Sequence, residues 1–360
     1  MRKAFDIVQL PVLLKRLADC GLSIQLLQMF QTYLYGRYQY VRFCNVVSPL
    51  FEVKSGVGQG SKLGPLFFLI LINNICDVVQ FARPYLFADD LKICMKINNL
   101  NDCIKLQQDI NSINNWCTQN FLSFNTDKCY CFTFTLKKQL IHYEYRIGNS
   151  TLKKPELIKD LGVTFDSKLS FDVHINNIVN SAFKMLGFLK RNSRDFKNEK
   201  TLITLYKSFV RSKLEYCSLI WDPLYENHIN QIERVQKKFL RFLNWKMRKE
   251  DSSRLPYSLL CERYQMSTLQ ERRSHAKILY LHKILHGHED NPSLLSSLGI
   301  LVSSTRSHGN FYVPTPRTNV YKKCPVFSLC SLANKLDNVD LFRYRNTKKF
   351  RSLTTCKLSK

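Results

Sequence analysis

The chain has 360 residues, 45% of them hydrophobic and 23% charged, which is a globular composition with enough length for two domains with cores of their own. Its formal net charge of +26 at pH 7 is unfavourable through self-repulsion unless a polyanion binds, so the charge points to a polyanionic partner. The 13 cysteines include no C-x-x-C pair, which argues against a zinc module.

The positive charge is concentrated after residue 150. Residues 1–150 carry 16 Lys and Arg against 10 Asp and Glu, whereas the remainder carries 38 against 18. We therefore expect the surface that meets a polyanion to lie in the C-terminal part. A merely basic protein stays an alternative on charge alone, because net charge informs on partners and not on fold.

Cysteine count and hydropathy bear on location. An odd number of cysteines with no signal peptide favours a reducing compartment, so we expect an intracellular protein, in the cytoplasm and/or the nucleus, that is not secreted. The apolar run Leu63–Ile75 has 13 residues, whereas a membrane-spanning helix needs about 20. We therefore expect no membrane partner.

In chain order, the first 120 residues predict four helices, because apolar residues recur at helical spacing. Gly21 stands where a helix C-cap belongs, and Pro65 suits a first helical turn. The predicted helices cover Lys3–Gly21, Ile24–Tyr35, Leu63–Val79 and Asn101–Gln119.

Segments rich in β-branched and aromatic residues lie among these helices and after them, and predict strands. The first two form a hairpin joined by Ser48-Pro49, and the next two surround Ala88-Asp89-Asp90. The predicted strands cover Arg37–Val47, Leu50–Val53, Tyr85–Phe87, Leu91–Met95, Tyr130–Leu136, Tyr143–Ile147 and Leu161–Phe165. This order of elements is typical of an α+β fold.

After Ser170 the pattern becomes helical, with Lys and Arg on the polar faces. Beyond about Ser303 the periodicity fades, and prolines predict an extended, weakly ordered tail. We therefore expect an α+β domain at 1–168, a basic helical domain at 169–300 and a tail at 301–360. The predicted helices of the second domain are Ile175–Arg191, Lys200–Cys217, His228–Leu243 and Leu269–Leu285.

Asp89-Asp90 is the first candidate site. Alone, an Asp-Asp pair in a hairpin is common without function, because Asp tolerates turn geometry. Here the flanking strands are apolar, and two carboxylates at the end of buried strands repel each other unless a cation or a proton separates them. Magnesium supplies that compensation, and polymerases use two such ions.

A glycine-rich turn precedes the third predicted helix. Gly56, Gly58 and Gly60 fall within five residues, which is also common in a plain loop. Such glycines permit close approach of the backbone to a nucleotide or a template strand. It is not a Walker loop, because G-x-x-x-x-G-K-[ST] is absent.

A third pattern, N-x-L-x-x-N-x-x-K, ends at Lys128. A helix-to-strand junction explains most of it. A lysine at this place could instead protonate or neutralise a leaving pyrophosphate.

Taken in order, S-G-V-x-Q-G-S-x-L-G-P at 55–65, F-A-D-D at 87–90 and N-x-L-x-x-N-x-x-K at 120–128 resemble the reverse transcriptases of non-LTR (LINE-type) retrotransposons, especially the Jockey-like group. L-G-V-x-F-D at 161–166 resembles the primer-grip region of that family, and 205–223 resembles the start of its thumb. The resemblance covers nearly all of the chain and implies a partial palm at 1–168 followed by an α-helical thumb at 169–300.

The resemblance also implies roles and partners. Asp89 and Asp90 would hold Mg²⁺, and Lys128 would face the triphosphate. The partners would be an RNA template, an RNA–DNA hybrid and, in an active enzyme, deoxynucleoside triphosphates. The residues implied to line the nucleotide and template pocket are Gly56, Gln59, Gly60, Ser61, Phe87 and Ala88.

Two departures from the family pattern matter. Gly58 stands where the family usually has Pro, which a turn tolerates. The family's first catalytic motif reads D-x-x-K-A-F-D, and Lys3-Ala4-Phe5-Asp6 matches only its end, so its metal-binding Asp would come before Met1. We therefore expect Mg²⁺ binding to be weak or absent in this chain. RNA-directed DNA polymerase activity and a non-catalytic nucleic-acid-binding remnant both stay open.

Overall fold

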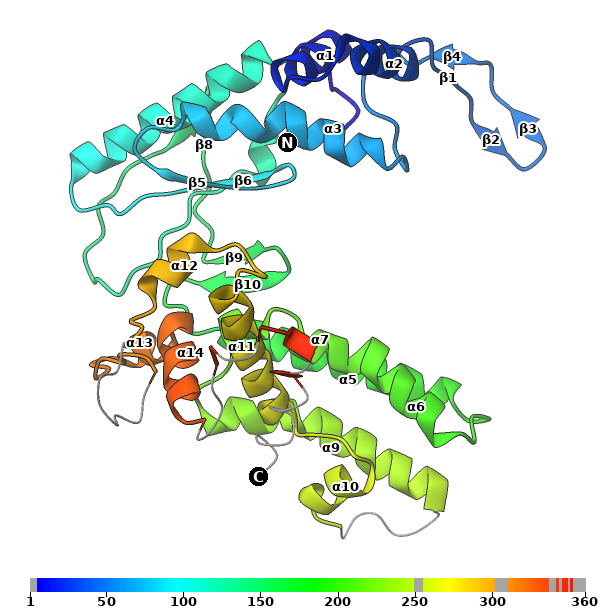
Figure 1. Ribbon diagram of the computed structural model, residues 1–360, viewed down its shortest axis with the longest axis vertical. Helices are drawn as coiled ribbons and strands as arrows, with labels where there is room; N and C mark the ends of the chain where they lie inside the picture. The colour runs from blue at the N-terminus through cyan, green and yellow to red at the C-terminus, as the bar shows by residue number, and fades with distance from the viewer. Residues whose placement is uncertain are drawn as a thin grey trace. The chain divides into compact units, whose positions relative to one another are not determined.

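The computed structural model describes residues 5–248, 255–301, 310–336, 341–342, 345–348 and 350–351. The chain divides into two compact units, Met1–Pro155 and Glu156–Lys360. Both contain helices and short strands, a mixed composition that agrees with the predicted α+β class (Figure 1). The predicted boundaries at 168 and 300 stay predictions, as does the assignment of palm and thumb.

Four helices build the first unit: α1 (Leu10–Asp19), α2 (Ile24–Leu34), α3 (Leu63–Ile72) and α4 (Leu100–Gln119). The predicted start of α1 at Lys3 lies outside the described residues, and residues 5–9 are not helical. Their backbone instead accepts hydrogen bonds from the glycine-rich turn, Gly56 N to Val8 O at 2.8 Å and Val57 N to Phe5 O at 2.9 Å. The helix then begins beside Pro11, whose ring favours the first turn.

The core of this unit is one cluster under α1, α3 and α4. It includes the buried side chains of Leu13, Phe67, Phe68 and Trp116. Helix α3 was predicted to reach Val79 but ends at Ile72, and a 3₁₀ helix, Asn73–Val78, continues the chain. Helix α4 matches its prediction to within one residue at its start.

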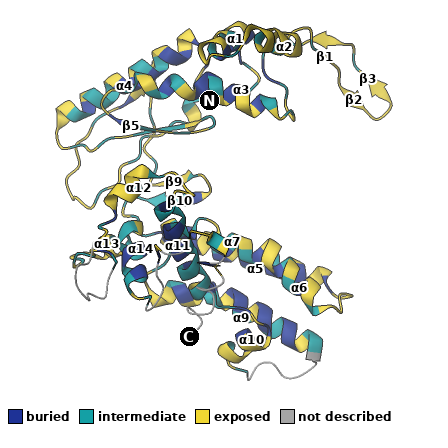
Figure 2. Cartoon of the chain, viewed as in Figure 1, coloured by how far each residue is buried: buried dark blue, intermediate teal, exposed yellow. Residues whose placement is uncertain are grey.

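The first predicted hairpin exists with a different turn. Strand β1 (Tyr38–Gln39) pairs with β4 (Phe51–Glu52), and β2 (Arg42–Phe43) pairs with β3 (Val46–Val47). The tip is therefore Cys44-Asn45, and the prediction of a turn at Ser48-Pro49 is wrong. Ser48 instead lies in the ladder, where its N–H donates to Val41 O at 2.9 Å. The strand residues of this ribbon are all exposed (Figure 2).

The second predicted hairpin is confirmed as β5 (Arg83–Phe87) and β6 (Asp90–Cys94). The strand predicted at Tyr130–Leu136 is wrong, since only an isolated bridge from Tyr130 to Lys153 forms there. The next prediction reduces to β7 (Arg146–Ile147), which pairs with β8 (Ser150–Thr151). Alternating aromatic residues give strand propensity, but a strand also needs a partner for its backbone groups.

The second unit opens with the hairpin of β9 (Leu157–Asp160) and β10 (Val163–Asp166). The predicted strand began at Leu161, but Leu161 and Gly162 both have positive φ and form the turn. A Cβ on Gly162 would come 3.0 Å from the ring of Tyr216, whose hydroxyl donates to Leu161 O at 2.9 Å. Two segments that carried the family resemblance therefore touch.

Helices make up most of the second unit. The predicted helix Lys200–Cys217 is interrupted by a π-helical segment, Tyr206–Arg211, between α6 and α7. The prediction for α11 is confirmed at both ends. The helices are α5 (Asp172–Asn192), α6 (Glu199–Leu205), α7 (Ser212–Glu215), α8 (Ser218–Trp221), α9 (Glu226–Arg248), α10 (Tyr257–Arg263), α11 (Leu269–Leu285), α12 (Pro292–Ser297), α13 (Asn319–Lys323) and α14 (Pro325–Asn334).

Part of the predicted tail is helical. Helix α14 buries Leu329, Cys330 and Ala333 in a cluster that also holds Ile278 and Leu281 of α11. The expectation of an extended chain is therefore wrong for Pro325–Asn334. The rest of the described tail is short segments, and residues 302–309 and 352–360 lie outside the description.

Candidate functional site

The Asp-Asp pair lies at the tip of the β5–β6 hairpin. Phe87 pairs with Asp90, so Ala88 and Asp89 are the two turn residues. Asp89 is half-buried and Asp90 is exposed. Leu86 and Leu91, one step further from the tip, pack against the core of the first unit. The apolar strands thus fix two carboxylates at a surface that solvent and a ligand can reach.

The turn between these strands is strained. Ala88 has a φ of 51°, a left-handed conformation that disfavours any residue with a Cβ by about 1–2 kcal/mol. Tight hairpin turns with positive φ at this position usually carry glycine. Such strain in a non-glycine residue is found at functional sites more often than elsewhere. Phe87, beside it, is 63% exposed.

A buried carboxylate holds the approach to this hairpin. Asp109 of α4 is only 1% exposed. It accepts hydrogen bonds from three successive backbone N–H groups, those of Gln80 at 2.9 Å, Phe81 at 3.0 Å and Ala82 at 2.7 Å. The sequence interpretation missed it. Its signal is a lone acidic residue next to Ile110, on the apolar stripe of an otherwise amphipathic helix.

The glycine-rich turn packs against the segment that begins the described chain. A Cβ on Gly56 would lie 2.8 Å from the backbone oxygen of Asp6, and its φ is +83°. Arg37 donates to Gly56 O at 2.6 Å. Gly56 is therefore buried and required by packing, and contact with a nucleotide stays a prediction for it.

The second half of the turn is bound to α3. The hydroxyl of Ser61 donates to Gly58 O at 2.8 Å and accepts from Gly64 N at 2.9 Å. A Cβ on Gly64 would come 2.7 Å from Gly58 O. Ser61 therefore holds the turn on the helix, whereas Gly60 is exposed with a φ of +81° and offers an accessible backbone.

Gln59 is exposed, and its side-chain amide donates to Asp6 Oδ1 at 2.6 Å. Lys128 lies at the end of a 3₁₀ helix, Thr126–Lys128, and its side chain is exposed. Leu122 of the same motif is buried in the cluster that also contacts Leu86. The three motifs thus share one core, while the role of Lys128 stays a prediction.

Two carboxylates alone are a sparse metal site. Among the described residues, no group of three His, Cys, Asp or Glu side chains could hold a metal ion. Mg²⁺ prefers oxygen ligands, keeps several of its waters and is commonly held by one or two carboxylates together with substrate phosphates. The chemistry of Asp89 and Asp90 therefore fits Mg²⁺, with water or phosphate completing the ligand set.

Helices α5 and α9 of the second unit present interleaved lysines and aromatic rings. Lys238 lies 4.9 Å from the ring centre of Phe183, and Lys190 lies 5.1 Å from that of Phe242. Burial and the nearby charge of Lys238 lower the pKa of Lys190. Trp245 is 60% exposed on the same helix as Phe242. Basic and aromatic side chains together suit contact with phosphates and bases.

No helix in the described part of the chain is both long and apolar enough to cross a membrane.

Comparison with known proteins agrees with these motifs. The family of "Reverse transcriptase (RNA-dependent DNA polymerase)" matches residues 1–204. The chain is 27% identical over 258 residues to the probable RNA-directed DNA polymerase from transposon X-element of Drosophila melanogaster, covering 68% of this chain and 27% of that protein. It is 29% identical over 267 residues to the RNA-directed DNA polymerase from mobile element jockey of Drosophila funebris, covering 70% and 29%.

The same element of Drosophila melanogaster encodes a third relative, 26% identical over 268 residues, or 71% of this chain and 29% of that protein. The chain thus spans less than a third of the length of these relatives. The matched segment contains both the glycine-rich turn and the Asp-Asp hairpin. The chain belongs to the reverse transcriptase family and resembles its Jockey-like, non-LTR retrotransposon members.

Proposed function

We propose that this chain contributes part of the nucleotidyl-transfer site of an RNA-directed DNA polymerase. The supporting observation is the placement of Asp89 and Asp90 at the tip of a core-anchored hairpin in a chain of the reverse transcriptase family. In this proposal residues 1–168 act as a palm and 169–300 as a thumb. The substrates are an RNA template, an RNA–DNA hybrid and deoxynucleoside triphosphates.

Each candidate residue has a role that its position allows. Asp89 and Asp90 hold Mg²⁺, which when bound stabilises the charge on the attacking and leaving oxygens. The side chain of Phe87 and the backbone of Gly60 are exposed and contact the nucleotide or the template. Lys128, also exposed, neutralises the leaving pyrophosphate. Gly56 and Ser61 keep the turn in shape through the contacts described above.

A second candidate function is nucleic-acid binding without catalysis. It is supported by the charge after residue 150, where 38 basic residues face 18 acidic ones, and by the lysine–aromatic pairs of α5 and α9. Contacts of this kind grip the phosphate backbone without reading sequence. They require neither Asp89 nor Asp90.

Primer extension separates the two candidates. The full chain is incubated with an oligo(dT) primer on poly(rA), with Mg²⁺ and deoxythymidine triphosphate. Incorporation that Asp89→Ala abolishes supports catalysis, and the same variant excludes a contaminating polymerase. Binding of the hybrid without incorporation supports the second candidate. Absence of hybrid binding at low salt would contradict both.

Metal binding gives an independent test. Calorimetry is expected to detect weak, roughly millimolar Mg²⁺ binding, as for sparse oxygen sites. The Asp89→Asn/Asp90→Asn variant should lose it. Glu52→Gln/Glu144→Gln removes the same charge from two exposed side chains of the first unit and should retain it. Equal binding by the two double variants would place the metal elsewhere.

A further inference from the structure

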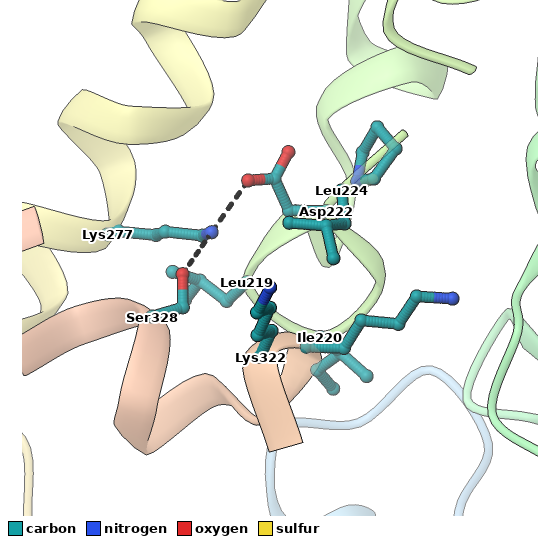
Figure 3. A pocket seen from close by; sticks show the side chains of 9 residues that line it. Leu219, Ile220, Asp222, Leu224, Lys277, Lys322 and Ser328 are labelled. Carbon is teal, nitrogen blue, oxygen red and sulfur yellow. Dashed lines mark hydrogen bonds and ion pairs between the residues drawn. The ribbon is translucent and has the colours of Figure 1, made fainter. Parts of the chain in front are cut away.

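A small pocket in the second unit is lined by positive charge. Its walls come from α8 and the turn that follows it, from α11, from α13 and from α14, and its volume is about 70 Å³ (Figure 3). One water molecule requires about 10–15 Å³ on such a measure, so the pocket holds several waters or one oxyanion. Its polar lining residues are Asp222, Lys277, Lys322, Lys323 and Ser328.

The one carboxylate of the pocket already has two cationic partners. Asp222 Oδ1 lies 2.6 Å from Nε of Arg273, and Asp222 Oδ2 lies 2.6 Å from Nζ of Lys277. Arg273 is 2% exposed and Lys277 is 8% exposed. These contacts leave little negative charge on Asp222 to offset further cations.

Two more lysines face the same space from the last turn of α13. Lys323 lies 5.1 Å from the ring centre of Tyr225 and donates to Ser170 O at 3.4 Å. Figure 3 shows the side-chain end of Lys322 turned toward Lys277 and Ser328. Across the described residues, neither Lys322 nor Lys323 forms an ion pair with a carboxylate. Four cations therefore surround one carboxylate, an imbalance that a bound anion relieves.

Hydrogen-bond donors remain for such an anion. Lys277 has three N–H donors and uses two of them, on Ser328 Oγ at 2.5 Å and on Asp222. Because the oxygen of Ser328 accepts from Lys277, its own hydroxyl proton is available to donate. Lysine ammonium groups and a hydroxyl are common phosphate ligands.

We infer that this pocket binds a phosphate group. The backbone of a nucleic acid is the source that the net charge of +26 favours, and a free phosphate ion shares the same chemistry. Every lining residue follows residue 204, so the pocket lies outside the segment that matches the reverse transcriptase family. It provides a grip on nucleic acid that is separate from the proposed transfer site and does not depend on it.

The test compares Lys322→Ala/Lys323→Ala with Lys197→Ala/Lys200→Ala, a control that removes the same charge from exposed lysines around the start of α6. Anisotropy of a labelled 12-nucleotide RNA is measured from low to moderate salt. The pocket variant should bind about five- to tenfold more weakly than the control, and its slope of log affinity against log salt should fall by about 0.7 per lost phosphate contact. Ser328→Ala should weaken binding without changing the slope, because it removes a donor and no charge.

A second arm identifies the source of the phosphate. Inorganic phosphate is added at constant ionic strength, and thermal unfolding is followed for both double variants. A rise in Tm for wild type and control alone, with equal RNA affinities, assigns the pocket to free phosphate. Identical behaviour of the two double variants in both arms overturns the inference. Wild-type chain that binds no RNA contradicts the nucleic-acid functions proposed above, while the phosphate arm still tests the pocket.

Discussion

The side-chain amide of Gln59 donates a 2.6 Å hydrogen bond to Oδ1 of Asp6, across 53 positions of sequence. Ser55 adds a hydrogen bond to the backbone oxygen of Asp6 at 3.0 Å. The end of the K-A-F-D segment is thereby tied to the glycine-rich turn. One donor of Gln59 is occupied in this arrangement, so contact of that amide with a nucleotide requires the second donor or an exchange of partners.

The close approach of this turn to Asp6 predicts a specific intolerance. Gly56→Ala should lower the free energy of unfolding by about 2–4 kcal/mol, because the new Cβ adds a clash with Asp6 to the strain of positive φ. Gly36→Ala is the matched control, since its φ is +64° and nothing lies within 4 Å of its Cβ. It should lose only about 1 kcal/mol. Urea unfolding measures both, and equal losses would show that the contact with Asp6 is unimportant.

Asp109 predicts that a helix residue controls the order of the Asp-Asp hairpin. Asp109→Asn replaces one acceptor oxygen by a donor that faces backbone N–H groups, and should cost about 1–3 kcal/mol of stability. Hydrogen exchange should quicken at the amides of Gln80–Ala82. Asp19→Asn, at an exposed position of α1, should change stability by less than about 0.5 kcal/mol. Unchanged exchange in Asp109→Asn would contradict the role.

The strained turn predicts a substitution that stabilises. Ala88→Gly should raise the free energy of unfolding by about 0.5–1 kcal/mol, because glycine adopts a φ of 51° without a Cβ penalty and the gain exceeds the added chain entropy. Ala18→Gly, within α1, should have the opposite sign by about the same amount. A loss of stability in Ala88→Gly would mean that the alanine methyl group makes contacts that outweigh the strain.

Local signals in the sequence predict some elements well. Helix α11 begins and ends where predicted, because Thr268 and Glu271 form a capping box at its start and the apolar periodicity runs to Leu285. The β5–β6 hairpin is short, and its apolar flanks and Asp-Asp tip specify it locally.

Other features depend on contacts that sequence periodicity does not contain. The start of α1 is shifted because the glycine-rich turn takes the backbone oxygens of Phe5 and Val8. Helix α14 forms on the surface of α11. Among site residues, Asp109 was missed because a buried acid is recognisable only once its three donors are placed around it.

A buried histidine predicts how stability depends on pH. Thr164 N of β10 donates to Nδ1 of His174 at 3.2 Å, and the histidine ring lies edge-on to Trp221 on α5's side of the core. Burial, with the charge of Lys159, lowers the pKa of His174 from its ordinary value of 6.5. The unfolded chain therefore takes up a proton first as pH falls. The stability contribution is complete above about pH 6.5 and is lost as pH falls toward the folded pKa.

Urea unfolding at pH 7.5, 6.5 and 5.5 should show this loss in the wild type. His275, whose pKa is also lowered by burial and by Arg351 and Arg272, contributes in the same direction. His174→Gln should be less stable than wild type at pH 7.5 and should lose less stability on acidification, because one of the two titrating groups is gone. A variant with the wild-type pH dependence would show that His174 is protonated in the folded chain, and that its hydrogen bond with Thr164 is not the one described.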